Sequence, residues 1–432
     1  MRNEEIPRLL VFGYPIEAAP VGGLLWSRRV SDSISKLGVL DVKNVSSERS
    51  IDAKLNTNQI LRNILPCLIM DFYDAVRGFV TLPQIALLDS WGEPSIFLWG
   101  LLRLFHPRTK IVVIFHHYEP RILPDRLSEL KSHFTRAFAK WYSSIIDKLT
   151  HMMINDSDMI LTVSRTSARQ LSYFYGITSN NVHEINKEQA EENSAPLASD
   201  KIRVVGTGVD RLTIDIHAQK DIDFFCIARI EKLDGVDSIW SALKKLRPNT
   251  NFVIIGRASL KEINHLKSLG INHKGEVSHQ EKVNLYSRSK VFLFPSSREG
   301  FGIALAESLQ LGMSAVIWKL PVFEELYLNS TMAKEGVIRL VERGNYELFA
   351  RQAIEALELY DKRTTVISTQ RSLATSYSSS SFVPVSSEGN KKVATVSVLE
   401  LAEKKPEEPV REILQSWDDV VGKVVKALSE LI

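Results

Sequence analysis

Short apolar runs alternate with longer segments of helical spacing along most of this 432-residue chain. The runs in the first half are Arg8–Phe12, Ile85–Leu88, Ile111–Phe115, Met159–Val163 and Ile202–Val205. Strands buried on both faces have continuous apolar sequences, and the helices between them cover a parallel sheet. The alternation therefore predicts an α/β fold built on parallel strands.

The same alternation begins again after the polar segments Lys187–Asp200 and Arg211–Asp221. Its elements are Phe224–Ile227, Val236–Leu246, Phe252–Ile255, Leu260–Leu269, a strand-like Lys274–Val277, Gln280–Ser287, Val291–Phe294 and a helix from Gly302 to Leu311. A chain of this length has room for two domains with separate cores. We predict two Rossmann-like domains, residues 1–208 and 209–414, that face a central cleft and bind ligands at the carboxyl ends of their strands.

The last seventy residues differ in character from the rest. Residues 363–408 are rich in Ser, Thr and Lys, which predicts a flexible excursion from the second domain. Residues 415–432 return to helical spacing. Their apolar face consists of Val420, Val421, Val424, Val425, Leu428 and Leu431. We expect this terminal helix to pack against another part of the chain.

Composition narrows the classes of function. Lys and Arg number 54 and Asp and Glu 51, a net charge of +3, whereas a nucleic-acid-binding protein usually has a marked basic excess. The two cysteines, Cys67 and Cys226, lie in apolar runs typical of buried thiols. Neither a signal peptide nor an apolar run of about 18 residues is evident, so we expect a cytoplasmic protein. Basic residues at Arg28, Arg29 and Lys36 would suit peripheral contact with a membrane, but an ordinary solvated helix face explains them equally well.

The most informative segment runs from Val291 to Gly312. A buried strand ends at Pro295, a loop with two glycines follows, and a helix then begins. The loop carries Glu299 and the helix carries Glu307, separated by seven residues. We expect the N–H groups of Phe301, Gly302 and Ile303 to point out of the helix start, where the helix dipole favours phosphate. Two carboxylates beside a phosphate site suggest that the ligand also presents sugar hydroxyls.

Two further groups suit such a ligand. Arg229 and Lys232 follow the first strand of the second domain, and two cations at a strand end can clamp a diphosphate. His116 and His117 follow the strand Ile111–Phe115, where a neutral imidazole can bond a sugar hydroxyl. The triplets Asp156-Ser-Asp158 and Asp221-Ile-Asp223 lie before a strand and in a linker, so we expect no metal site there.

The pair Glu299 and Glu307, in an E-G-F-G setting, resembles the E-x7-E signature of retaining GT-B glycosyltransferases, family 4 in particular. The resemblance covers about Arg8 to Leu326 and resumes at the last helix, which in the family crosses back to the N-terminal domain. It implies that Glu307 binds the ribose hydroxyls and that Glu299 contacts the donor sugar. Arg229 and Lys232 resemble the G-R-x-x-x-K-G element that neutralises the diphosphate, although the spacing here is Arg-x-x-Lys.

The resemblance assigns roles to residues of both domains. It implies a sugar-binding histidine at His116, with His117 as the alternative, and donor contacts at Gly22, Gly23 and Val277. The expected activity is retaining transfer of a hexose from UDP-glucose or a similar nucleotide sugar to a glycan or lipid-linked glycan. No cofactor or metal is expected, and oligomeric state is not readable.

Two rival functions remain. A dinucleotide-dependent oxidoreductase would need a G-x-G-x-x-G turn after the first strand, and Gly13, Gly22 and Gly23 do not fit that spacing. A catalytically silent glycosyltransferase-like binding subunit would be expected to lack Glu299, Glu307 or Arg229, and all three are present.

Overall fold

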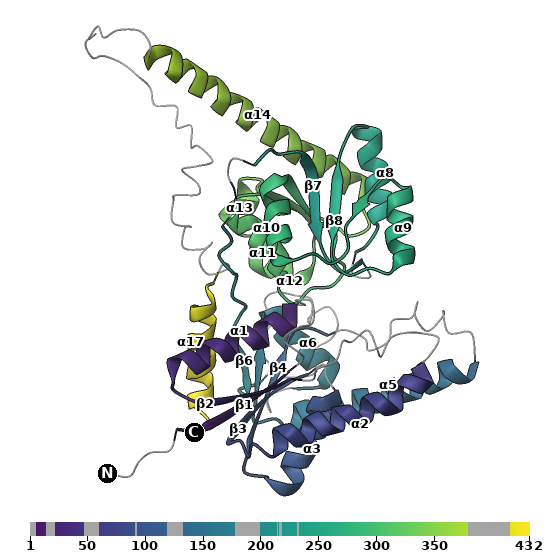
Figure 1. The fold of residues 1–432 in the computed structure, drawn as a ribbon, viewed down its shortest axis with the longest axis vertical. Coiled ribbons are helices and arrows are strands. Elements are labelled where there is room, and N and C mark those ends of the chain that lie inside the picture. The colour runs from purple at the N-terminus through teal and green to yellow at the C-terminus, as the bar shows by residue number, and fades with distance from the viewer. Residues whose placement is uncertain are drawn as a thin grey trace. The chain divides into compact units, whose positions relative to one another are not determined.

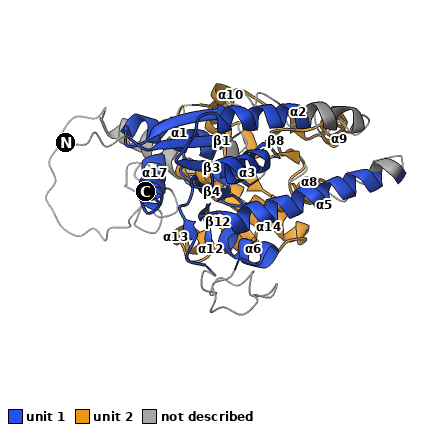
Figure 2. Ribbon diagram, turned by 90° about the horizontal axis from the view of Figure 1, so that it is seen from below, with its two compact units in different colours: residues 1–209, 299–303, 415–432 blue, residues 210–298, 304–414 orange. Residues whose placement is uncertain are grey.

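The protein was analysed as a computed structural model, shown in Figure 1. The structure describes residues 6–13, 22–46, 60–90, 93–118, 133–177, 199–213, 215, 218–230, 233–378 and 415–432. The chain divides into two compact units, coloured separately in Figure 2. Unit 1 comprises residues 1–209, 299–303 and 415–432, and unit 2 comprises residues 210–298 and 304–414.

Unit 1 contains a parallel sheet with strand order β2-β1-β3-β4-β5-β6. Its strands are β1 (Arg8–Gly13), β2 (Asp41–Ser46), β3 (Ile85–Asp89), β4 (Lys110–Phe115), β5 (Met159–Thr162) and β6 (Ile202–Val204). Its helices are α1 (Gly22–Leu37), α2 (Ile60–Phe79), α3 (Glu93–Phe105), α5 (His133–Asp156), α6 (Arg165–Tyr175) and α17 (Trp417–Ser429). Every strand pairing is parallel, because each strand returns through a covering helix or connection.

Unit 2 contains a second parallel sheet, with strand order β12-β11-β10-β7-β8-β9. Its strands are β7 (Ile222–Ile227), β8 (Phe252–Ile255), β9 (Asn272–His273), β10 (Ser289–Phe294), β11 (Ser314–Trp318) and β12 (Ile338–Val341). Its helices are α8 (Val236–Leu246), α9 (Leu260–Ser268), α10 (His279–Arg288), α11 (Ile303–Gln310), α12 (Pro321–Tyr327), α13 (Thr331–Lys334) and α14 (Tyr346–Ser378). The described residues therefore form two α/β units on parallel sheets, which confirms the predicted fold class.

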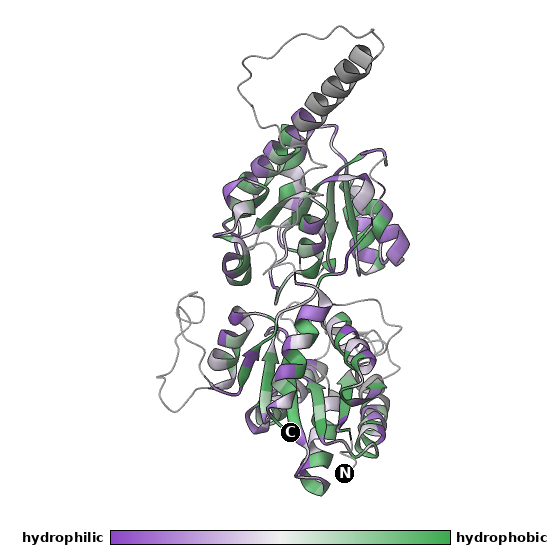
Figure 3. Ribbon diagram, turned by 90° about the vertical axis from the view of Figure 1, so that its left-hand side faces the viewer, coloured by the Kyte–Doolittle hydropathy of each residue, from purple (hydrophilic) through white to green (hydrophobic). Residues whose placement is uncertain are grey.

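The apolar runs that predicted the strands are the cores of the two units. Every residue of β3, β5 and β8 is buried, and the strands in Figure 3 are largely apolar while the helices around them carry polar outer faces. In unit 2 the core continues into α14, where Phe349 and Leu357 are fully buried against the sheet. Burial of both sheet faces explains why the strands lack polar alternation.

Two sequence predictions were wrong in detail. Lys274–Val277 is a loop, since β9 ends at His273 and Gly275 takes a left-handed φ of +74°. Residues 363–378, predicted to begin a flexible excursion, are the continuation of α14. This stretch has no Gly or Pro to end the helix, and Ser and Thr residues are compatible with a helical backbone. The rest of the excursion, residues 379–408, lies outside the described residues.

The terminal helix α17 belongs to unit 1, where it packs against α1. Its start is joined to the end of the unit 1 sheet, because the Val209 N–H donates to the carbonyl of Gln415 at 3.0 Å. A Cβ added to Gly208 would lie 2.4 Å from the ring of Trp417, so this close approach requires glycine. The Arg203–Glu430 ion pair, at 2.7 Å, holds the other end of the helix.

We expect Gly256→Ala to destabilise unit 2 by about 2 kcal/mol or more. Gly256 follows β8 with φ +130°, and a Cβ there would lie 2.2 Å from the backbone carbonyl oxygen of Ala228. Gly270→Ala is the matched control, because its φ is also positive (+82°) but nothing lies within 4 Å of the added atom. Urea unfolding would measure both, and equal losses of stability would contradict the expectation.

Candidate functional site

The loop after β7 and the loop after β10 lie side by side at one edge of the unit 2 sheet. The strand order reverses between β7 and β10, since the next strand, β8, lies on the other side of β7. In open α/β sheets such a reversal opens a crevice at the carboxyl ends of the strands, where ligands bind. Arg229 follows β7, and the loop that carries Glu299 follows β10, so both loops begin at the predicted edge of this sheet.

Backbone contacts fix these two loops to each other. The Asp234 N–H donates to the carbonyl of Pro295 at 2.9 Å, and Leu233 forms an antiparallel bridge with Ser296. Arg229 is half-buried, two residues after the end of β7. Lys232, the second predicted cation, lies outside the described residues.

Glu307 lies one turn into α11 and is only 3% exposed. The Lys282 ammonium donates to its Oε1 at 2.8 Å. The Tyr286 hydroxyl lies 3.1 Å from its Oε2. Burying a carboxylate is costly unless it is paired and hydrogen-bonded, and α10 supplies both partners from one helical turn. The carboxylate is therefore held in one orientation.

The Tyr286 hydroxyl stays protonated under all ordinary conditions. Full burial raises the pKa of this phenol well above its usual value, and the negative charge of Glu307 raises it further. A protonated phenol can donate to the carboxylate, whereas a phenolate would repel it. Tyr286 therefore acts as a permanent hydrogen-bond donor that orients Glu307.

The turn into α11 contains the predicted phosphate-binding backbone. Phe301 is buried at 6% exposure, Gly302 has a left-handed φ of +85°, and α11 begins at Ile303. A residue with φ near +85° is strained unless it is glycine, so the turn needs Gly302. Glu299 is half-buried at the start of this turn.

Residues 299–303 belong to unit 1. Within unit 1, a Cβ added to Gly300 would lie 2.3 Å from the carbonyl oxygen of His116. The Ser167 hydroxyl donates to the same carbonyl at 2.5 Å. Glycine at position 300 therefore lets the loop that carries Glu299 lie directly on the backbone of the predicted histidine.

His116 is the centre of a polar group in unit 1. The sheet order reverses between β1 and β3, and His116 follows the neighbouring strand β4. Its Nε2 is 3.7 Å from the Asp89 carboxylate at the end of β3, and its ring makes an edge contact with Trp26 of α1 at 6.0 Å between centroids. These residues bring the ends of β3 and β4 together with α1. The choice of His116, with His117 as the alternative, stays a prediction.

For Gly22, Gly23 and Val277 the structure gives a position in the fold. Gly22 and Gly23 are the first two residues of α1, which places them after β1 in unit 1. Val277 is partly buried against the core of unit 2, beside the loop in which the Gly256 N–H donates to the Gly275 carbonyl. The sequence offered no reason to single out Lys282, Tyr286, Asp89 or Trp26. A Lys-x3-Tyr spacing on one face of a helix was the only available signal for the first two.

The Asp-x-Asp triplets are part of ion pairs in the described structure. Asp158 accepts from Arg103 and Lys110 at 3.2 Å each, and Asp223 accepts from Lys290 at 3.0 Å. Asp221 is bonded to Arg288. These carboxylates thus connect the beginnings of β5 and β7 to neighbouring elements of the same unit.

Comparison with known proteins agrees with this arrangement. Residues 214–372 match the sequence model of the family described as Glycosyl transferases group 1. A stretch of 180 residues is 26% identical to the UDP-N-acetylglucosamine–peptide N-acetylglucosaminyltransferase GtfA subunit of Streptococcus pneumoniae. That stretch is 40% of this chain and 34% of the relative, so the match spans about a third of the relative's length.

Solved structures resemble the chain over nearly its whole length. Sucrose-phosphate synthase from Thermosynechococcus elongatus aligns with a TM-score of 0.59 and 11% identity, covering 98% of this chain and 99% of that one. The catalytic domain of starch synthase IV from Arabidopsis thaliana, bound to ADP and acarbose, gives the same values. At such identities the likeness shows the fold, which is GT-B.

The chain is therefore a GT-B protein with two parallel-sheet α/β units. The match of residues 214–372 to the group 1 model includes Arg229 and Glu307, which belong to unit 2. No described helix has both the length and the apolar character needed to cross a membrane.

Proposed function

We propose that this protein is a retaining glycosyltransferase of the family 4 type, which transfers a hexose from a nucleotide sugar to a glycan or lipid-linked glycan. The observation that carries the proposal is the buried Glu307 carboxylate, fixed by Lys282 and Tyr286 one turn into α11. A carboxylate in a fixed orientation suits two vicinal ribose hydroxyls, which need two acceptors at set positions. The group 1 match over the same segment supports this reading.

Residues of unit 2 and of the turn into α11 would bind the donor. The N–H groups at the start of α11, from Phe301 to Ile303, favour the phosphates through the helix dipole. Arg229, and Lys232 as predicted from the sequence, would stabilise the charge that develops on the departing nucleoside diphosphate. Since cations of the chain serve this purpose, we expect turnover without added metal, to be checked by assay in EDTA.

Unit 1 would orient the sugar and receive the acceptor. The imidazole of His116 can hydrogen-bond a hydroxyl of the donor sugar, and the Asp89 carboxylate lies 3.7 Å from its Nε2. Glu299 would contact the same sugar from the loop that lies on the His116 backbone. In a front-face reaction with retention, the departing phosphate would take the proton of the acceptor hydroxyl as the new glycosidic bond forms.

The donor is proposed to be a UDP-hexose. The name of the Streptococcus pneumoniae relative includes a UDP-N-acetylglucosamine donor and a peptide acceptor, which supports UDP as the nucleotide. UDP-glucose and UDP-N-acetylglucosamine are both suitable candidates. The cytoplasmic location and the peripheral membrane contact predicted from the sequence stay predictions.

A nucleotide screen tests the proposal directly. Thermal unfolding would be followed with UDP, GDP, ADP, NAD and the corresponding sugars, since a ligand that binds the folded state raises Tm. We expect UDP and UDP-hexoses to raise Tm most, and UDP-hexose to be hydrolysed slowly without acceptor. A rise in Tm with NAD alone would favour an oxidoreductase. UDP binding without any hydrolysis or transfer would favour a silent binding subunit.

Tyr286→Phe is expected to weaken UDP binding about tenfold while the fold is kept. The change removes only the hydroxyl that orients Glu307, and phenylalanine still fills the buried space against Phe225. Titration calorimetry with UDP would measure the affinity. Tyr173→Phe, an exposed tyrosine of α6, is the control. Unchanged UDP affinity in Tyr286→Phe would contradict a role of Tyr286 in positioning Glu307.

A further inference from the structure

An open cavity of about 400 Å³ lies in unit 1 between α5 and α6. The proposed donor and acceptor chemistry uses none of its residues. The lining residues are Tyr118, Lys140, Ser143, Ser144, Asp147, Lys148, His151, Phe174 and Tyr175. A cavity of this size falls within the range of roughly 300–1,000 Å³ that is typical of small-ligand sites.

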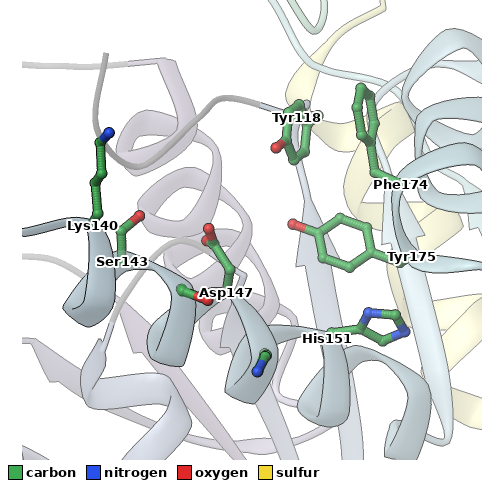
Figure 4. A pocket seen from close by; sticks show the side chains of 9 residues that line it. Tyr118, Lys140, Ser143, Asp147, His151, Phe174 and Tyr175 are labelled. Atoms are coloured by element: carbon green, nitrogen blue, oxygen red, sulfur yellow. The ribbon is translucent and has the colours of Figure 1, made fainter. Parts of the chain in front are cut away.

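One wall of the cavity is aromatic. The rings of Tyr118 and Phe174 are stacked, with centroids 3.7 Å apart and planes 9° apart. Figure 4 shows Tyr118 on the cavity side of Phe174, so that Phe174 backs it. The backbone N–H of Tyr118 donates to Gln170 of α6 at 2.8 Å, which fixes its position. Tyr175 lies below and makes edge contacts with Phe115 and His151. The wall is therefore a supported aromatic platform.

The opposite wall is a polar face of α5. Lys140, Ser143, Ser144, Asp147 and His151 recur at helical spacing, so their side chains lie on one side of the helix. In Figure 4 the hydroxyl groups of Tyr118 and Tyr175 point toward Asp147 across the cavity. Burial, and to a lesser degree the charge of Asp147, raises the pKa of Tyr118, so that this phenol remains a donor. Hydroxyl donors and acceptors thus converge on the space in front of the platform.

We infer that this cavity binds a sugar residue of a glycan. One face of a pyranose ring carries C–H groups that pack on an aromatic face, while its rim of hydroxyls both donates and accepts hydrogen bonds. The platform and the Asp147 face supply these two kinds of contact on opposite sides. A purely apolar ligand would desolvate the lysines and Asp147 without replacing their hydrogen bonds. A phosphate would meet the Asp147 carboxylate.

The place of the cavity along the chain suggests which glycan it binds. Tyr118 comes two residues after His116, so the platform begins beside the proposed sugar-binding histidine and continues along α6. This inference rests on the proposed function. If the acceptor reacts near His116, the cavity holds a more distant sugar of the same acceptor. Longer saccharides would then bind better than monosaccharides, because two linked contacts raise the effective concentration.

The test measures saccharide binding by the full chain. Saturation-transfer NMR and titration calorimetry would be carried out with N-acetylglucosamine, chitotriose and maltotriose. We expect at least one trisaccharide to bind, and the affinity to fall at least about tenfold in Asp147→Asn and in Tyr118→Leu. Trp141→Ala is the matched control, since Trp141 is an exposed aromatic residue of the same helix (58% exposed) that does not line the cavity. In each variant, Tm without ligand reports whether the protein is folded, and the rise in Tm with UDP reports whether the donor site is intact.

The outcomes are distinguishable. Trisaccharide binding that is lost in the two cavity variants, kept in Trp141→Ala and accompanied by an unchanged UDP response supports the cavity as a sugar site. Absence of saccharide binding in the parent protein with a normal UDP response overturns the inference and leaves the proposed function standing. Binding of inorganic phosphate that depends on Lys140 and Lys148 and displaces the saccharide would also overturn it. Saccharide binding without any UDP response would refute the proposed function alone.

Discussion

Replacing Arg229 with alanine is expected to lower the turnover of glycosyl transfer at least about a hundredfold. Arg229 follows β7, at the edge where the strand order reverses, and is half-buried. In a partly buried position a fixed positive charge stabilises a developing diphosphate charge more than solvent could. Because the charge is largest in the transition state, kcat should fall more than the affinity for UDP-hexose.

Arg247→Ala is the control for this experiment. Arg247 belongs to unit 2 but follows α8 and precedes β8, so it lies at the amino edge of the sheet, where it pairs with Asp361 at 3.4 Å. Steady-state assays of both variants with UDP-hexose would give kcat and KM. Equal turnover of Arg229→Ala and the parent protein would refute the assigned role. A higher KM with unchanged kcat would mean that Arg229 binds the substrate without stabilising the transition state.

Glu307→Ala is expected to weaken UDP binding by about ten- to a hundredfold, the range for losing hydrogen bonds to a charged group. The Lys282 side chain, 21% exposed, can turn to solvent when its partner is removed, and Tyr286 keeps a second acceptor in the Ala304 carbonyl at 3.0 Å. The fold should therefore survive the change. Calorimetric titration with UDP measures the loss directly.

Glu355→Ala serves as the control for Glu307→Ala, since Glu355 is an exposed carboxylate of α14 in the same unit. Comparison of UDP with deoxyuridine diphosphate adds a sharper criterion. If Glu307 binds the ribose hydroxyls, its removal should diminish the preference for UDP over the deoxy analogue. Full UDP affinity in the variant would refute the ribose assignment.

The fold was predictable from the chain because its strands carry a strong local signal. Runs such as Ile111–Phe115 and Phe252–Ile255 are buried on both faces, so almost every residue in them is apolar. The strand β2, Asp41–Ser46, went unrecognised because it is the edge strand of its sheet and contains Asp, Lys, Asn and Ser. An edge strand with one neighbour needs fewer apolar residues, so its sequence resembles a loop.

The candidate site was predictable only where its residues lie in short motifs. Glu299 and Arg229 follow strands within a few residues, and Glu307 lies in the helix that comes next after β10. Strand ends mark the ligand edge of a parallel sheet. The partners Lys282 and Tyr286 lie more than twenty residues before Glu307, on another helix. The contact of Asp89 with His116 likewise depends on two strands being neighbours. Such pairings come from tertiary packing, which spacing in one sequence does not encode.

The order in which the parts of unit 1 appear along the chain has a consequence for its synthesis. Its last helix, α17, follows about 200 residues that belong almost entirely to unit 2. At a translation rate of about 5–20 residues per second, a nascent chain waits roughly 10–40 s between Val209 and Gln415. During that interval unit 2 can fold on the ribosome, while Gly206 and Gly208 still lack their contacts with Gln415 and Trp417. Protection by a chaperone would be needed most at these two glycines.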